Sequence, residues 1–270
     1  MLSGITIGQY FPGDSLIHRM DPRVKLILTF AYIIAVFIPR NWVGMGLAAG
    51  FLILSVALSR LPVKLVWKSV KPILPLIVFT SVINIFFVDG DPLADWWIFH
   101  ITVQGVVTAV FIALRIVCLI AGSSLLTYTT SPTTLTDALE RLMKPLKVLH
   151  VHVHEIAMMM TIALRFIPTL VEETDKIMSA QKARGADIES GGLMQRIRAL
   201  IPILIPLFVS SFRRAYELAM AMECRCYHGG EGRTRMKQLH LSPRDVVCLL
   251  VTTALIGGVI GLNFVIPAAF

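Results

Sequence analysis

The chain has 270 residues, 56% of them hydrophobic, and a mean hydropathy of +0.74. Soluble domains contain about 45–50% apolar residues, so this composition excludes an ordinary soluble domain and predicts an integral membrane protein. The net charge of +8 does not indicate nucleic-acid binding, because no basic stripe is interleaved with aromatic residues and membrane proteins concentrate Lys and Arg in cytoplasmic loops.

Five apolar runs predict five transmembrane helices, because each approaches or exceeds the ~20 residues that cross a bilayer. The first run follows Asp21-Pro22, a favourable helix start. The tight turn Pro39-Arg40-Asn41 separates it from the second run, so these two should form a helical hairpin. The five runs cover residues 24–38, 42–58, 72–88, 101–128 and 246–268.

Loop charges predict the orientation of these helices. The loop between the second and third runs carries Arg60, Lys64, Lys68 and Lys71 and no acid, whereas the next loop carries Asp89, Asp91 and Asp95 and no Lys or Arg. The excess of positive charge on cytoplasmic loops places the first of these loops inside and the second outside. The N-terminus is then cytoplasmic and the C-terminus lies outside.

The chain is therefore predicted to have three parts. Residues 1–128 hold an N-terminal segment and four transmembrane helices, residues 129–245 form a cytoplasmic-side coupling domain of three helices, and residues 246–270 form the last transmembrane helix. The predicted fold class is an all-α integral membrane protein with about five transmembrane helices and this domain inserted before the last crossing.

The coupling domain begins with a short amphipathic helix after the cap Ser131-Pro132. Two long, mostly apolar helices follow, and each ends in an arginine between small residues. The first stops at Ala183-Arg184-Gly185 and the second at Cys224-Arg225-Cys226. Both helices are too apolar for a solvated face, yet too charged toward their ends to cross a bilayer easily. We therefore expect them to bind other proteins.

Arg184 and Arg225 are the main candidate site residues. The planar guanidinium suits carboxylates in buried interfaces, and small neighbours let it enter a groove. The alternative is a cation that only complements the negative end of a helix dipole, and spacing alone favours this alternative slightly. The presence of two such ends on two solvent-averse helices favours docking.

Three further features have both a structural and a functional explanation. Arg115 lies in the fourth apolar run, where an ionisable residue suggests a function unless it pairs with a polar group such as Asn84 or reaches the interface. The methionines of residues 158–160 suit either core packing or a surface that accepts several partners. Two alternating sets could bind metal but lack a second ligand pair at zinc spacing: His150, His152 and His154, and Cys224, Cys226 and His228.

Several kinds of catalytic motif are missing from the sequence. No Gly-Lys dipeptide occurs, so the chain has no P-loop and is not expected to hydrolyse ATP by that route. We expect no catalytic residue, no cofactor and no metal bound by this chain.

Taken together, the motifs resemble the transmembrane T component of energy-coupling factor (ECF) transporters for vitamins and other micronutrients. The first Ala-Arg-Gly matches that family's signature, whereas the second arginine, often followed there by Gly-Tyr, is flanked here by cysteines. The resemblance covers nearly the whole chain and includes Gly8-Gln9-Tyr10, Pro12-Gly13-Asp14-Ser15, His18-Arg19-x-Asp21-Pro22-Arg23-x-Lys25, Thr129-Thr130-Ser131-Pro132, Ala163-Leu164-Arg165-Phe166-Ile167-Pro168, Ala180-Gln181-Lys182-Ala183-Arg184-Gly185-Ala186-Asp187, Arg214-Ala215-Tyr216-Glu217-Leu218-Ala219 and Glu223-Cys224-Arg225-Cys226-Tyr227.

The resemblance implies a non-catalytic scaffold in the cell membrane. Two ATP-binding-cassette ATPases would bind ATP and Mg²⁺, and Arg184 and Arg225 with their neighbours would dock into grooves on them. A small membrane protein, the substrate-binding S component, would contact the apolar faces of the long helices. The residues expected to face it are Met158, Met159, Met160, Ile201, Leu204, Ile205 and Leu207.

Two other functions remain open on the sequence. A self-sufficient secondary transporter or channel would need polar residues along a path through the crossings, and Arg115 and Asn84 give thin support. An ordinary importer permease of the ATP-binding-cassette class would itself line the path of the substrate.

Overall fold

The computed structural model describes residues 10–88, 92–96, 99–186, 192–230 and 239–266. Gly8, Gln9, Asp89, Asp91 and Asp187, which the sequence analysis named, lie outside the described residues. Within those ranges the chain divides into two compact units, one from Leu139–Lys237 and the other from Gly8–Ala138 with Gln238–Phe270. The predicted domain limits at residues 128 and 246 stay a prediction.

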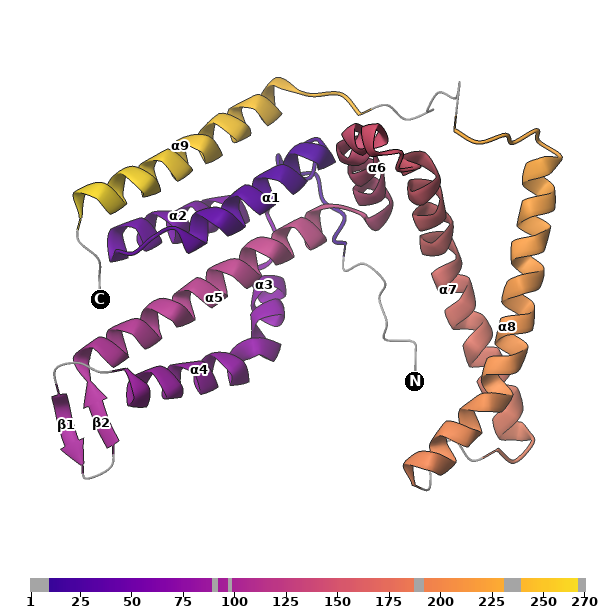
Figure 1. The fold of residues 1–270 in the computed structure, drawn as a ribbon, viewed down its shortest axis with the longest axis horizontal. Helices are drawn as coiled ribbons and strands as arrows, with labels where there is room; N and C mark the ends of the chain where they lie inside the picture. The colour runs from indigo at the N-terminus through magenta and orange to yellow at the C-terminus, as the bar shows by residue number, and fades with distance from the viewer. Residues whose placement is uncertain (1–9, 89–91, 97–98, 187–191, 231–238, 267–270) are drawn as a thin grey trace. The chain divides into compact units, whose positions relative to one another are not determined.

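The structure is almost entirely helical, which confirms the predicted class of an all-α membrane protein (Figure 1). A small antiparallel hairpin of β1 (Pro92–Trp96) and β2 (Phe99–Thr102) was not predicted; it pairs Ala94 with Ile101. The elements are α1 (Pro22–Phe37), α2 (Trp42–Ser59), α3 (Val63–Val70), a short 3-10 turn (Lys71–Ile73), α4 (Leu74–Phe87), β1 (Pro92–Trp96), β2 (Phe99–Thr102), α5 (Val103–Thr129), α6 (Pro132–Met143), a second 3-10 stretch (Lys144–Leu149), α7 (Val153–Ala183), α8 (Leu193–Glu223) and α9 (Pro243–Val265).

Six segments of the described chain are long and apolar enough to cross a membrane. Four of them contain predicted crossings: α2, the run from α3 through α4, α5 and α9. The other two are α7 and α8, the predicted coupling helices. The predicted first crossing, α1, has 16 residues, about 24 Å of helix, and falls short of a hydrocarbon core of roughly 30 Å. Which of these helices cross stays a prediction.

The core of the second unit lies between α1, α2, α5 and α9. Tyr32 of α1 is 4% exposed and stacks on Phe51 of α2, with ring centroids 5.8 Å apart. Gly122 of α5 allows this packing, because a Cβ there would lie 2.5 Å from the Tyr32 ring. Cys118 is buried in the same cluster.

The turn between α1 and α2 is fastened by side chains from two distant helices. Arg115 of α5 donates from Nη2 to the Pro39 carbonyl at 2.8 Å, and its guanidinium lies 5.0 Å from the Phe111 ring centroid. Asn263 of α9 donates to the Ile38 carbonyl at 2.7 Å. The structural explanation of Arg115 is therefore supported, but Asn84 as its partner is wrong, since Asn84 donates to the Thr80 carbonyl of its own helix.

The N-terminal ends of α1 and α9 meet in a buried polar cluster. Asp21 is the N-cap of α1, as predicted, and its backbone N–H donates to Asp245 Oδ1 of α9 at 3.1 Å. Arg23 pairs with the Asp21 carboxylate at 2.6 Å. The amine of Lys25 donates to the carbonyls of His18, at 3.1 Å, and of Thr129 at the end of α5, at 3.0 Å. The conspicuous charges around Asp21-Pro22 thus join the ends of three helices.

Candidate functional site

The two arginine ends of α7 and α8 have the same backbone geometry. At the end of α7, the N–H of Gly185 donates to the Lys182 carbonyl at 3.0 Å and that of Ala186 to the Gln181 carbonyl at 3.0 Å. At the end of α8, the N–H of Cys226 donates to Glu223 at 2.8 Å and that of Tyr227 to Met222 at 3.1 Å. Each pair of bonds is a Schellman motif, which closes a helix C-terminus by satisfying its last carbonyls.

The motif puts Arg184 and Arg225 at equivalent positions, each directly before the residue with left-handed backbone. That residue is Gly185 in α7, with φ of 86°, and Cys226 in α8, with φ of 53°. Glycine adopts this conformation freely, whereas an L residue does so at a cost. The departure of the second end from the Arg-Gly pattern therefore falls on the one position where glycine matters most.

All six residues predicted to dock are exposed. Within the described residues, neither Arg184 nor Arg225 has a carboxylate within ion-pair distance. Both guanidinium groups, without a carboxylate partner in the described part of the chain, can pair with an external carboxylate.

Helices α7 and α8 pack against each other in antiparallel directions and cross (Figure 1). Glu173 of α7 accepts hydrogen bonds from Ser210 and Arg214 of α8, the latter at 3.0 Å. Further toward the end of α7, Gln181 Nε2 donates to the Pro202 carbonyl near the start of α8 at 3.2 Å.

The antiparallel packing places the two arginines at opposite ends of the pair. Arg184 follows Gln181 and therefore lies beside the first turns of α8. Arg225 lies about 35 Å of helix beyond Pro202, beside the other end of the crossing. The two ends can therefore engage two separate partners.

The residues predicted to face a second membrane protein do not form one patch. Met158, Met159 and Met160 lie in the first turns of α7, about 30 Å of helix from Gln181. Ile201, Leu204, Ile205 and Leu207 of α8 lie near Gln181 because of its contact with Pro202. Met159 and Ile205 are about 60% exposed, and Met158 and Leu207 are half-buried.

The structure adds an aromatic surface that the sequence analysis missed. Phe208, Phe212 and Tyr216 of α8 are 60%, 71% and 67% exposed, and the two phenyl rings stack with centroids 6.3 Å apart. Spacing of four residues puts them on one face of the helix, continuing the line of Ile201 and Ile205. That spacing was the signal available in the sequence.

Neither alternating set is assembled as a metal site in the described structure. No group of three metal-ligating side chains comes together among the described residues. His154 Nδ1 instead lies 3.1 Å from Glu140 Oε1, and Cys224 and Cys226 are exposed at the end of α8.

Comparison with known proteins agrees with this architecture. The model of the cobalt transport protein family CbiQ matches residues 13–236. The energy-coupling factor transporter transmembrane protein EcfT of Clostridium kluyveri is 54% identical over 258 residues, covering 95% of this chain and 96% of that protein. The proteins of the same name from Ruminiclostridium cellulolyticum and Bacillus subtilis are 52% and 46% identical, over 98% and 95% of this chain and 99% and 98% of their own lengths. The chain therefore belongs to the CbiQ family of transport proteins, as a transmembrane component of the energy-coupling factor type.

Proposed function

We propose that this chain is the non-catalytic scaffold that couples two ATP-binding-cassette ATPases to a substrate-binding S component in the uptake of a vitamin or other micronutrient. The observation that carries this function is the pair of helix ends with the same Schellman geometry, which expose Arg184 and Arg225 at opposite ends of the crossed α7 and α8. Neither arginine has a carboxylate within ion-pair distance among the described residues. One arginine would dock into each ATPase. ATP and Mg²⁺ would be bound by the ATPases and not by this chain, whose sequence has no P-loop.

The exposed apolar surface of α8 supports the second partner. The most apolar stretch of α8 has only 6% of its residues buried, and the corresponding stretch of α7 has 11%. Such a surface is not stable in water and marks a site for protein or membrane contact. We assign the line from Ile201 through Phe212 to Tyr216 to the S component. Residues 158–160 would contact it separately, near the start of α7.

Coupling would follow from the rigidity of the crossing. The bonds of Glu173 with Ser210 and Arg214 hold the middle of α7 to the middle of α8. When the ATPases close on ATP, the helix ends would move with them and the crossing would pass that motion to the S component. In this arrangement the N-terminus and the coupling domain face the cytoplasm and the C-terminus lies outside, as the loop charges predict.

The test is co-purification of the ATPases with variants of the tagged chain expressed with its partners. Arg184→Ala with Arg225→Ala should weaken ATPase binding by about 2–5 kcal/mol, roughly 30-fold or more in Kd, because a buried partner carboxylate is left unpaired.

The matched control is Arg165→Ala with Arg213→Ala, which removes an exposed arginine from the body of each helix. It should leave ATPase binding nearly unchanged. Full recovery of both ATPases with the Arg184 and Arg225 double variant would exclude docking through these ends.

A further inference from the structure

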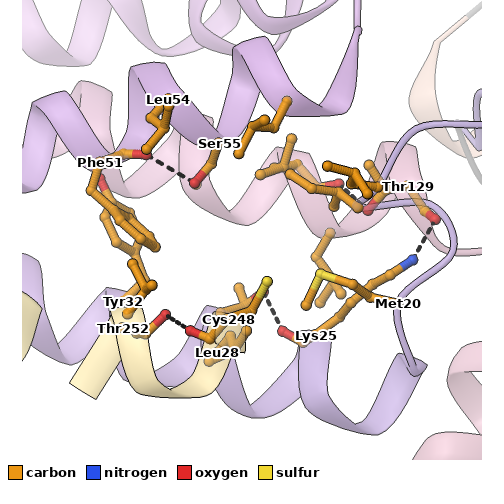
Figure 2. Close-up of a pocket in the computed structure, with 18 of the residues that line it drawn as sticks. Met20, Lys25, Leu28, Tyr32, Phe51, Leu54, Ser55, Thr129, Cys248 and Thr252 are labelled. Atoms are coloured by element: carbon orange, nitrogen blue, oxygen red, sulfur yellow. Dashed lines mark hydrogen bonds between the residues drawn. The ribbon is translucent and has the colours of Figure 1, made fainter. Parts of the chain in front are cut away.

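A cavity of about 530 Å³, open on one side, lies between α1, α2, α5, α9 and the segment before α1 in the second unit (Figure 2). This volume is within the ~300–1,000 Å³ of ordinary small-molecule sites. Its walls are almost entirely apolar; representative lining residues are Leu28, Leu54, Leu125 and Val251.

Apart from Arg244 at one end, the polar side chains of the wall already have partners in the protein. Lys25 Nζ donates to the Thr129 carbonyl at 3.0 Å, Ser55 to Phe51 at 2.8 Å and Thr252 to Cys248 at 2.9 Å (Figure 2). Because these groups are satisfied, the cavity offers little to a polar solute. It suits a hydrocarbon chain.

A second cavity, of about 330 Å³, adjoins the first and shares Leu16, Leu58 and Arg244 with it. It is cationic, since Arg19, Arg60 and Arg244 line it with Asp14 as the single acid. Arg19 lies 3.5 Å from Asp14, whereas Arg60 and Arg244 have no carboxylate within ion-pair distance among the described residues. The apolar cavity thus opens beside Arg60 and Arg244, two guanidinium groups without a carboxylate partner among the described residues.

The depth of the apolar cavity matches one leaflet of a bilayer. Arg60 is the C-cap of α2, and the lining reaches back along that helix to Phe51. The distance is about 13 Å of helix, and half of a roughly 30 Å hydrocarbon core is ~15 Å. Arg244 lies at the start of α9, beside the same end of the apolar cavity. The arginines therefore lie at the level of lipid headgroups when the apolar cavity lies among acyl chains.

We propose that the second unit, embedded in the membrane, binds an anionic phospholipid. One acyl chain would lie in the apolar cavity and the phosphate would lie between Arg60 and Arg244. Arginine near a membrane surface attracts acidic lipids, and a buried chain adds apolar contact. In the proposed orientation this is the inner leaflet. The lipid site includes no residue of α7 or α8, so the tests of lipid binding and of ATPase docking are independent.

The probe is a vesicle of defined composition. The chain is purified with its partners and reconstituted in phosphatidylcholine vesicles in which phosphatidylglycerol makes up a tenth of the lipid molecules. It is then extracted again in mild detergent, and the phospholipid that stays bound is quantified by mass spectrometry. We expect retained phosphatidylglycerol to exceed its share of the vesicle. Arg60→Gln with Arg244→Gln should lower its retention by about tenfold or more, since each charge contributes to binding.

Two controls separate the lipid site from general effects. Lys64→Gln with Lys68→Gln removes the same charge from exposed positions of α3 outside both cavities and should leave retention unchanged. Cys248→Phe fills the apolar cavity and should reduce retention, whereas Ile53→Phe, on an exposed face of α2 outside the apolar cavity, should not.

Three outcomes would overturn the lipid site. Equal retention by the Arg60 and Arg244 double variant excludes recognition of the phosphate. Displacement of phosphatidylglycerol by millimolar inorganic phosphate, with no effect of Cys248→Phe, indicates a free-anion site at the arginines only. A photoactivatable residue at Ser55 that captures a membrane protein instead of lipid shows that the apolar cavity is a protein interface.

Discussion

The two helix ends differ at a single residue with a physical consequence. Both Schellman motifs need a residue in the left-handed region, and only the first has glycine there. The second places Cys226 at φ of 53°, a conformation that disfavours L residues by roughly 1–2 kcal/mol. The end of α8 should therefore open more often than the end of α7.

We expect Cys226→Gly to stabilise the end of α8 and Gly185→Ala to destabilise the end of α7, for the same reason. Hydrogen exchange of the Tyr227 amide, which donates to Met222, should slow by roughly fivefold or more in the first variant. Exchange at the Ala186 amide should speed up by a similar factor in the second.

Gly192→Ala is the matched glycine control, because Gly192 has φ of −71° and nothing within 4 Å of an added Cβ. Its effect on both amides should be negligible. Unchanged exchange at Tyr227 in Cys226→Gly would mean that the left-handed residue does not limit opening of this end.

Among the elements, α8 lacks a backbone hydrogen bond because of a proline, and a side chain of α7 replaces it. Pro206 lacks an N–H, so it cannot donate to the Pro202 carbonyl one turn earlier. Gln181 of α7 donates to that carbonyl instead, at 3.2 Å. The gap in the backbone ladder of α8 thus becomes a contact that sets its register against α7.

A double-mutant cycle tests this replacement. Gln181→Ala should lower the free energy of unfolding by up to about 1 kcal/mol, because the Pro202 carbonyl loses its donor. In a Pro206→Ala background the new N–H supplies that donor within α8, so the same change should have almost no effect. Denaturant titration in detergent measures both.

Ser179→Ala is the comparison within α7, since the Ser179 hydroxyl donates to the backbone carbonyl of Asp175 in its own helix. Its effect should be equal in the two backgrounds. An effect of Gln181→Ala that is the same with and without Pro206 would rule out the proposed replacement.

For the molecule as a whole, polar clusters join the helices of the second unit at both of their ends. Arg115 and Asn263 hold the turn after α1, and Asp245 holds the start of α9 to the start of α1. Asp245 is 1% exposed and accepts from the N–H groups of Asp21 at 3.1 Å and Ser242 at 2.8 Å. These bonds join parts of the chain that are far apart in sequence.

Asp245→Asn should lower the free energy of unfolding by about 1.5–3 kcal/mol, the worth of a hydrogen bond to a charged group, because its amide cannot accept both backbone donors. Asp14→Asn is the control, since the Asp14 side chain is 89% exposed, and surface changes usually stay within about 0.5 kcal/mol. Equal stability of the two variants in a denaturant titration would show that the hydrogen bonds of Asp245 do not stabilise the junction of α1 and α9.

The local sequence determined where most helices of this protein lie and where they begin and end. Apolar runs, Asp21-Pro22 and the stop after Arg184 predicted most helices and their limits, because helix formation and capping depend on residues within a few turns. The arginine ends were predicted in the same way, and the structure gives them one shared backbone motif.

Tertiary structure decided which distant residues meet. Arg115 bonds Pro39 and not Asn84, Asp245 bonds Asp21, and the two arginines lie at opposite ends of the crossed helices. The apolar cavity between α1, α2, α5 and α9 also emerged only there, and so did the exposure of Phe208 and Phe212, although their spacing was present in the sequence. These features depend on how whole helices pack side by side, and a local pattern of residues does not encode that packing.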